Sequence, residues 1–449
     1  MLYAQGTSST GGPARRRAFG GDLWRHRDFR LVWAGESISS LGSEVSLLAL
    51  PLVAVRTLHA SVVQIGGLSA AGNVAYLVVG LPAGAWVDRL RRQPLMIGAD
   101  LGSALVLASV PIAAGLGVLR LPQLFVVAFA AGVLNVVIGV AWQPYLPTLI
   151  DDEHLVEGNS NMTGTAQVAA VAGPGIAGLL VQALGGAYAV AVDAVSFLVS
   201  AAALRRVSTT EPPPPAPAGV VRLGDPGVAD VAGADRAGAG RRPRMRSEIT
   251  EGLRYLLGHR VLRMITASGM VSNFAFSMGG ALTVVFLARS LHQSATAIGL
   301  LFAAGGVGGI AGAMSASPGA RRFGARRVCL VGMAVSALGF ALLPLAYAGA
   351  RLALFAAGEV LVSWGVVVFN ITMVSFRQRL VPNRILGRVV ASQRVIMWGS
   401  APIGALVGGA LGQAIGVRGT LWVAAASSLP GLAILLAAPM SGRDPAAPN

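Results

Sequence analysis

The sequence has too few charged residues for a soluble protein of its size. Charged residues make up only 12% of the 449 residues, whereas 54% are hydrophobic and the mean hydropathy is +0.67. A soluble chain cannot bury that much apolar surface. The uncharged run from Val62 to Val87 is long enough to cross a bilayer, which needs about 20 apolar residues per helix. The composition therefore excludes an ordinary soluble protein and predicts a membrane protein of many spans.

One cysteine and five histidines leave little material for disulfide or metal chemistry. Cys329 has no partner for an intramolecular disulfide, and its apolar surroundings predict a buried, unreactive thiol. The histidines are scattered along the chain, so no metal-ligand cluster is expected. The sequence also contains no motif that pairs a catalytic nucleophile with a base. The sequence therefore predicts no metal, no cofactor and no enzymatic activity.

Lysine is absent, and the 35 basic residues are all arginine, which gives a net charge of +16. In a soluble protein that charge would favour nucleic acid as the partner. The arginines instead cluster in alternate connections between the apolar runs, at 15–17, 89–92, 241–246, 321–327 and 377–394. The other connections carry single arginines: Arg56, Arg120, Arg289, Arg351 and Arg418. This alternation follows the positive-inside rule, so it predicts no nucleic-acid partner and both termini on the cytoplasmic side of the inner membrane.

One connection departs from that pattern. The segment between the fourth and fifth apolar runs is acidic, with Asp151, Asp152, Glu153 and Glu157. Acidic residues carry little weight in the positive-inside rule, so the predicted orientation stands.

Twelve apolar runs are long enough to span a bilayer. We expect spans near residues 29–55, 62–87, 94–118, 122–149, 159–184, 187–206, 264–289, 295–317, 327–348, 351–380, 387–414 and 417–440. The predicted organisation is a cytoplasmic tail at 1–28, a six-helix bundle at 29–206, a linker at 207–258, a second six-helix bundle at 259–440 and a tail at 441–449. The Pro-rich part of the linker predicts disorder, and 247–258 predicts a helix on the membrane surface.

The two groups of six spans show signs of an internal repeat. Gly173-Pro174 in the fifth run and Ala401-Pro402 in the eleventh lie at corresponding places. Gly84 and Gly312 are each followed by an arginine-bearing loop. Six plus six spans with a tether between them predict an all-α membrane protein with the layout of a two-bundle secondary transporter.

Three sequence motifs carry a resemblance to a known family of membrane proteins. The segment Gly84-Ala-Trp-Val-Asp88-Arg89-Leu-Arg91-Arg92 resembles motif A of the major facilitator superfamily, the charged loop that stabilises one access state in that family, and Asp100 is a candidate member of the same cluster. Gly173-Pro174-Gly175-Ile-Ala-Gly178 resembles the hinge signature in the fifth helix of drug:proton antiporters. The stretch from Pro144 through Ser160, with Asp193 to Phe197, is similar to the branch of macrolide-efflux proteins and siderophore exporters.

The resemblance implies proton-driven export of small amphipathic or hydrophobic compounds, such as drugs and antibiotics, by alternating access. The implied partners are a small-molecule substrate, protons and the lipid bilayer, and the protein is expected to work as a monomer. A dedicated exporter of an endogenous metabolite, such as a siderophore, is the first alternative. A non-transporting receptor or scaffold is the second, because no arginine lies in the fourth span, where several antiporter branches use one for proton relay.

Acids within the spans are the candidates for proton coupling, since a charge at the bilayer centre costs about 2.5 kcal/mol or more. Glu44, near the middle of the first span, is the first candidate, and its alternative is a neutral, hydrogen-bonded carboxyl. Glu36 lies eight residues earlier near the same helical face, where we expect it to face Arg30 or a loop arginine. Glu359 in the tenth span is a further candidate, whereas Asp193 in the sixth is expected to be structural.

The substrate cavity is expected to be apolar and aromatic with few polar groups, as suits a bulky amphipathic ligand. The candidate lining residues are drawn from the fourth, seventh and tenth spans: Asn135, Trp142, Gln143, Asn273, Phe276, Met278, Trp364, Asn370 and Met373. For each of them, a position facing lipid or another helix is an equal alternative.

Overall fold

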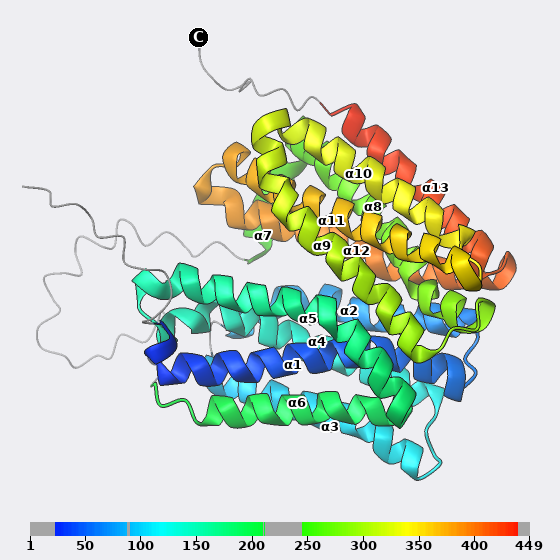
Figure 1. Ribbon diagram of the computed structural model, residues 1–449. Coiled ribbons are helices and arrows are strands. Elements are labelled where there is room, and N and C mark those ends of the chain that lie inside the picture. Colours follow the sequence, from blue (N-terminus) through cyan, green and yellow to red (C-terminus); the bar gives the residue numbers. More distant parts are fainter. Residues whose placement is uncertain (1–22, 88–89, 210, 212–244, 439–449) are drawn as a thin grey trace, which may run out of the picture.

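The computed structural model describes residues 23–87, 90–209, 211 and 245–438. Within these residues all regular elements are helices (Figure 1). Twelve of the described helices are long and apolar enough to cross a membrane, which confirms the predicted all-α fold with twelve spans. The two tails, most of the linker, Asp88 and Arg89 lie outside the described residues.

The first six spans form one bundle and the last six form the other. The first bundle comprises α1 (Arg27–Leu52), α2 (Val62–Val87), α3 (Arg92–Gly115), α4 (Leu121–Leu149), α5 (Leu155–Leu184) and α6 (Gly186–Arg205). The second comprises α8 (Arg260–Val285), α9 (Ala295–Phe323), α10 (Ala325–Leu342), α11 (Leu352–Leu380), α12 (Asn383–Ala414) and α13 (Val417–Leu436). Helices satisfy their own backbone hydrogen bonds, so they are the form in which such apolar runs cross a membrane.

The helix predicted at the end of the linker is α7 (Met245–Gly258). It packs against the first turns of α12, where Glu251 forms an ion pair with Arg388 and Gly252 contacts the Arg388 backbone. This contact ties α7 to the second bundle.

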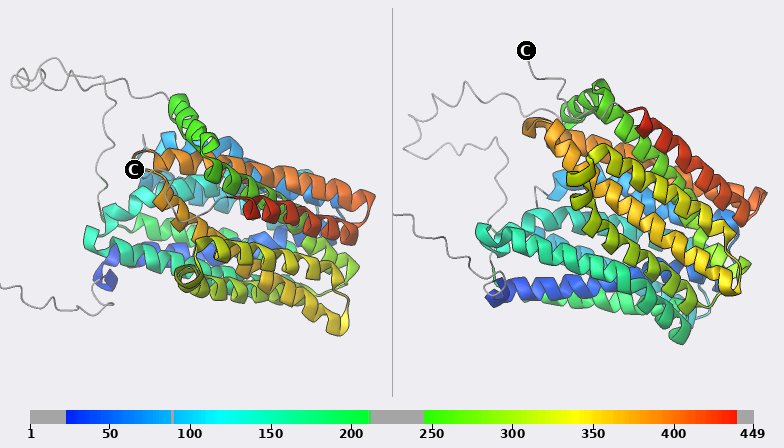
Figure 2. Two further views of the ribbon diagram at one scale, coloured as in Figure 1. Left: turned by 90° about the horizontal axis from the view of Figure 1, so that it is seen from above. Right: turned by 45° about the horizontal axis from the view of Figure 1, so that its top comes forward.

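The two bundles converge at one end and diverge at the other (Figures 1 and 2). The bundles meet at the end of the molecule where α1 and α8 finish, called the latch end here, and they separate at the end where α1 begins and α6 finishes, called the linker end. Ring stacking of Tyr76 in α2 on Trp398 in α12, with centroids 5.4 Å apart, marks a contact near the middle of both helices. The cross-bundle contacts therefore run from the latch end to the middle of the helices.

Glycine makes the cross-bundle contacts close. A Cβ added to Gly178 in α5 would lie 3.0 Å from the Cα of Gly299 in α9, and one added to Gly66 in α2 would lie 2.7 Å from the Cα of Gly409 in α12. Lipid tails are as apolar as the helices, so such contacts depend on small residues that let backbones approach. The α5–α9 and α2–α12 pairs thus form two equivalent seams.

The repeat between the bundles is most exact at the ends of α1 and α8. Each helix continues into one π-helical turn, Val53–Thr57 after α1 and Phe286–Ser290 after α8. The segment Arg56-Thr-Leu-His59-Ala-Ser61 matches Arg289-Ser-Leu-His292-Gln-Ser294, and both histidines have positive φ, 49° and 51°. In the same register, His26 precedes α1 as His259 precedes α8.

Enlarging Gly178 tests the α5–α9 seam. Gly178→Leu should lower the free energy of unfolding by about 1–3 kcal/mol, the usual cost of overpacking a close contact. Thermal unfolding of purified protein measures the effect. Gly164→Leu on the same helix is the control, because a Cβ at Gly164 meets nothing within 4 Å. Equal melting temperatures for the two variants would contradict the seam.

Candidate functional site

Two glutamates of α1 share one pocket inside the first bundle. Glu36 and Glu44 line it together with three hydroxyl groups of the same helix and with Asn135 of α4. The hydroxyls belong to Ser39, Ser40 and Ser43. Apolar side chains of α4, α5 and α6, including Ile138 and Phe197, complete the wall. The pocket thus combines two carboxyl groups with neutral hydrogen-bonding groups in an otherwise apolar setting.

Small residues on another face of α1 turn the polar face toward this pocket. Gly35 lies against Ser200 and Ala203 of α6, and Gly42 lies against Ser196. These glycines are seven residues apart, two turns along one face, so α6 covers that face closely. The glutamates, which lie off that face, are left to line the pocket.

Glu36 forms no ion pair with Arg30 or with another described arginine. Glu36 lies in the pocket with Glu44, and the ion pairs of the described residues include neither glutamate. Arg30 is six residues earlier, which places it about 120° away around a helix of 3.6 residues per turn. The eight-residue spacing to Glu44 keeps the two carboxyl groups on nearly the same face, as the sequence predicted.

Glu44 lies directly against the Gly-Pro motif of α5. A Cβ added to Gly173 would lie 2.7 Å from Cγ of Glu44, so only glycine leaves room for the carboxyl side chain. The next residue, Pro174, points its carbonyl oxygen at the backbone of Gly299 in α9. The motif therefore touches the acid of α1 on one side and the opposite bundle on the other.

Two arginines join the bundles at the latch end. The guanidinium of Arg56 donates to the carbonyl oxygen of Gln293, and that of Arg289 donates to the carbonyl oxygen of Val55 at 3.0 Å. We call these two reciprocal hydrogen bonds the latch. Both arginines are single basic residues in sparsely charged connections, so the charge pattern alone does not reveal their role. The repeated pattern Arg-(Thr/Ser)-Leu-His-x-Ser was the signal that could have revealed them.

The motif A segment is described only in part. Gly84 lies in the last turn of α2, and Asp88 and Arg89 fall outside the described residues. Arg92 forms an ion pair with Glu211 at 3.3 Å, and the same carboxylate accepts the backbone N–H of Arg92 at 2.7 Å and of Gln93 at 3.3 Å. A carboxylate at a helix N-terminus is stabilising, so Glu211 fastens the start of α3. Arg91 immediately precedes α3.

Asp100 is 3% exposed and lies beside the Ser200 hydroxyl of α6. Asp88 and Arg89, with which it was expected to cluster, lie outside the described residues. Asp193 is 2% exposed and accepts a hydrogen bond from the Ser196 hydroxyl at 3.2 Å, a position that fits the structural role expected for it.

Glu359 lies apart from the acidic pocket. It is in α11, where its carboxylate and the Ser363 hydroxyl face Gly305 of α9. Of the nine candidate lining residues, Asn135 reaches the pocket, and it also accepts a hydrogen bond from the Tyr76 hydroxyl at 3.3 Å. Trp142 is half-buried against the core of the first bundle, whereas Gln143 and Asn370 are exposed.

The other lining candidates take part in helix packing. Met278 of α8 is 1% exposed and packs against the glycines of α12. Met373 of α11 is 8% exposed in the interior of the second bundle. Asn273 donates to the carbonyl of Met397 at 2.7 Å, Trp364 donates to the Ser315 hydroxyl at 3.1 Å, and Phe276 meets Phe340 edge to face. Met278 and Met373 therefore take the helix-packing alternative, because their side chains are buried against neighbouring helices.

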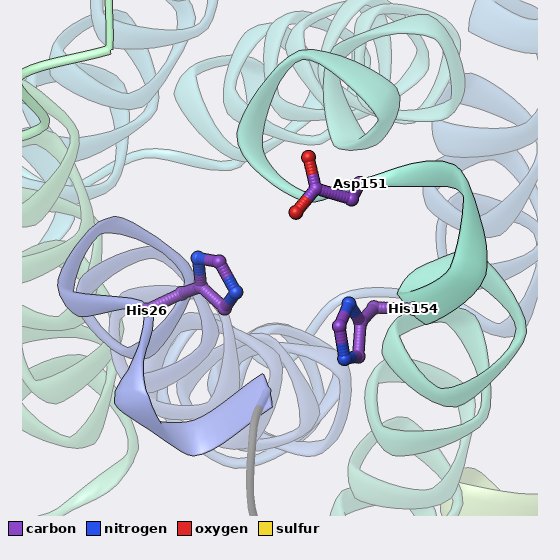
Figure 3. Close-up of side chains that lie close together, drawn as sticks. All are labelled: His26, Asp151 and His154. Atoms are coloured by element: carbon purple, nitrogen blue, oxygen red, sulfur yellow. The ribbon is translucent and has the colours of Figure 1, made fainter.

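The expectation that no metal-ligand cluster forms is wrong. His26, Asp151 and His154 come together at the linker end (Figure 3), with ligand atoms that all lie within 4.8 Å of one another. The sequence could not show this because the segments before α1 and after α4 are more than a hundred residues apart.

The helices and seams described above form a multi-pass membrane protein built from two related bundles. The family model of the Major Facilitator Superfamily matches residues 32–285 and 265–449, and the chain belongs to this superfamily. It is therefore a secondary transporter of small molecules and not an enzyme.

Two relatives are similar over most of their length. The multidrug efflux pump Tap of Mycolicibacterium fortuitum is 26% identical over 388 residues, which cover 84% of this chain and 88% of Tap. The uncharacterized transporter y4rN of Sinorhizobium fredii is 26% identical over 393 residues, covering 85% and 87%.

Solved structures share the fold. A bacterial homologue of the iron transporter ferroportin in an inward-facing state matches with a TM-score of 0.69 and 16% identity, over 93% of this chain and 99% of that one. The nucleoside transporter NupG matches with a TM-score of 0.70 and 11% identity, over 92% and 99%.

Substituting Gly173 tests the contact with Glu44. Gly173→Val should displace the carboxyl and lower the transport rate by about tenfold or more, since misplacing a reactive group by about 1 Å has that order of effect. Transport of labelled substrate by the purified protein in proteoliposomes measures it. Gly164→Val, whose new side chain meets no neighbour, should transport normally. Normal transport by Gly173→Val would show that the contact has no part in function.

Proposed function

We propose that the protein is a proton-coupled exporter of small amphipathic or hydrophobic compounds that works by alternating access. One observation carries this proposal: Glu44 lies against Gly173, and the adjoining Pro174 lies against the opposite bundle. A change at the Glu44 carboxyl therefore acts directly on a seam between the bundles.

The charge distribution supports a cytoplasmic location for the linker end. The described arginines that flank that end include Arg27, Arg30, Arg205, Arg321 and Arg388, whereas the latch end has only the single arginines of its connections. Under the positive-inside rule the linker end faces the cytoplasm of the inner membrane. The arrangement in Figure 1, joined at the latch end and apart at the linker end, then corresponds to an inward-facing state.

The composition of the pocket supports a mechanism in which one carboxyl group binds a proton and the substrate in turn. No described basic side chain forms an ion pair with Glu36 or Glu44, so a proton or a cationic ligand can offset their negative charge. Proton binding and substrate binding would then compete for the same carboxyl. Competition of this kind is what an antiporter requires, because each ligand shifts the two-state equilibrium only through its differential affinity for the states.

The substrate class follows from the pocket and from the relative. An apolar wall with carboxyl, hydroxyl and amide groups suits an amphipathic compound, above all one with a positive charge. Tap is a multidrug efflux pump, which agrees with export of such compounds. Glu44 is the proposed coupling residue, with Glu36 beside it, and we propose that one chain is the functional unit.

Neutralising Glu44 tests proton coupling. In proteoliposomes with the wild-type protein, adding an amphipathic cation should drive proton movement, and Glu44→Gln should reduce that movement about tenfold or more because the amide cannot exchange a proton. A pH-sensitive dye inside the vesicles measures the exchange. Glu359→Gln is the matched control, since Glu359 lies outside the pocket, and should retain coupling. Unchanged exchange in Glu44→Gln would remove Glu44 as the coupling residue.

Breaking the latch tests alternating access. Arg56→Gln and Arg289→Gln should favour the state that is open at the latch end, by about fivefold for each hydrogen bond worth about 1 kcal/mol. Spin labels at the exposed positions 116 and 350, one in each bundle at that end, measure the separation by pulsed electron paramagnetic resonance. Cys329 is buried, as predicted, and does not compete for the label.

The control for the latch is Arg418→Gln. Arg418 also donates to a backbone carbonyl, that of Ala346 at 3.0 Å, but this bond lies within the second bundle. The separation between the labels should therefore stay as in the wild type. A latch variant with the same distances as Arg418→Gln would rule out a gating role for the two arginines.

A further inference from the structure

Three metal-binding side chains meet at the linker end, outside the pocket and the seams. His26 immediately precedes α1, and Asp151 and His154 lie in the connection from α4 to α5 (Figure 3). Their ligand atoms all lie within 4.8 Å of one another. In Figure 3 the Asp151 carboxylate points toward the space between the two imidazole rings.

The donor set identifies the class of ion. Two imidazole nitrogens and one carboxylate oxygen suit borderline divalent transition metals such as Zn²⁺ and Co²⁺, whereas Mg²⁺ and Ca²⁺ prefer oxygen ligands alone. The backbone N–H of His154 donates to the carbonyl of Asp151 at 2.9 Å, so a tight turn holds these two donors at a fixed spacing. Asp151 is exposed and gives an ion access from water.

The ring of His26 makes different contacts from the ring of His259, the residue at the equivalent position before α8. Both histidines stand at the N-cap position of the helix that opens a bundle. The ring of His259 accepts the backbone N–H of Leu262 at 3.5 Å and so caps α8. The ring of His26 makes no such bond, and it lies instead 5.7 Å from the ring of His154, centroid to centroid. His26 therefore does not cap its helix as His259 does, and its ring contacts the ring of His154 instead.

His154 supplies a second, independent observation. It stands at the N-cap position of α5 without capping it, and its Nδ1 atom is buried without a hydrogen-bond partner among the described residues. Buried polar atoms are normally paired, so an unpaired imidazole nitrogen needs an explanation. A bound metal ion is the partner that fits a histidine beside another histidine and a carboxylate.

The acidic connection completes the argument. Asp151, Asp152, Glu153 and Glu157 all lie between α4 and the first turn of α5, at the end of the molecule where arginines dominate. Arg25, Arg27 and Arg30 flank His26 in the sequence and would repel a cation, whereas Asp151, Glu153 and Glu157 attract one. A cation-binding site would explain why this connection is acidic although it lies at the arginine-rich end of the molecule.

We propose that His26, Asp151 and His154 form a binding site for one divalent transition-metal ion of the Zn²⁺ type. The ion joins the start of α1 to the start of α5. These helices carry Glu44 and the Gly173-Pro174 motif, so the site braces the two elements that meet in the acidic pocket. It is separate from the transport pocket and does not depend on the transported compound.

Metal binding to the full-length protein in detergent tests the proposal. The protein, purified with a tag free of histidine and stripped with a chelator, is titrated with Co²⁺ and then with Zn²⁺. We expect one Co²⁺ per chain with visible absorption bands, displacement of Co²⁺ by Zn²⁺, a higher melting temperature with Zn²⁺ and no effect of Mg²⁺. Wild-type protein that binds no Co²⁺ would overturn the proposal.

Single substitutions locate the site. His26→Gln, Asp151→Asn and His154→Gln should each weaken Co²⁺ binding by more than about tenfold, because loss of a mere supporting group at a metal site costs about 10–100-fold. His259→Gln, at the matching position before α8, should bind as the wild type does. Binding that survives all three substitutions, or that falls equally with His259→Gln, would overturn the proposal.

A measurement on the wild type guards against variants that fold poorly. Diethyl pyrocarbonate modifies accessible histidines, and mass spectrometry reports each of them. Zn²⁺ should protect His26 and His154 and leave His59, His259 and His292 as reactive as before. Equal protection of all five histidines, or of none, would contradict the proposed site without reference to transport.

Discussion

In a bilayer, burying apolar surface between the two bundles contributes little free energy, because lipid tails are equally apolar. The contact between the bundles therefore depends on how closely their backbones approach. Glycine supplies that approach at Gly66 and Gly409 and at Gly178 and Gly299. The same condition holds inside the first bundle, where glycines of α1 bring α6 close. That packing fixes the rotation of α1 and therefore the direction of its glutamates. Close helix contact is thus the constraint that places both the seams and the acidic pocket.

The Gly-Pro motif of α5 makes two close contacts, one within the first bundle and one with the second bundle. Gly173 leaves space for Glu44, and Pro174 presents its carbonyl to Gly299 across the seam. Under the proposed function, the motif couples the Glu44 carboxyl to the opposite bundle through a single residue step. A change in the size or charge of the Glu44 group would then act on the same backbone that forms the seam.

The fold could be predicted from the sequence because apolar length and arginine placement are local signals. The pocket could be predicted in part: Glu44 and Glu36 follow from their rarity and spacing, but the rotation of α1 follows from its contact with α6. The same limit explains Met278 and Met373, which have the composition of a cavity wall but face other helices. His26 and His154 are distant in sequence, and only tertiary packing brings them together. By contrast, the repeated Arg-(Thr/Ser)-Leu-His-x-Ser pattern was present in the sequence and would have identified the latch.

The repeat separates what both bundles share from what only one possesses. Helices α1 and α8 have equal lengths, equal π-helical ends and reciprocal arginines, so the latch is symmetric. In the same register Glu36 corresponds to Gly269 and Glu44 to Ser277, so the acids belong to the first bundle alone. The capping histidine His259 likewise corresponds to His26, which has turned to a different partner. The symmetric parts join the two bundles at the latch end, whereas the two glutamates of the pocket belong to the first bundle. A single charged site on one side of a symmetric seam is sufficient to bias the seam, because the opposite bundle needs only to fit against it.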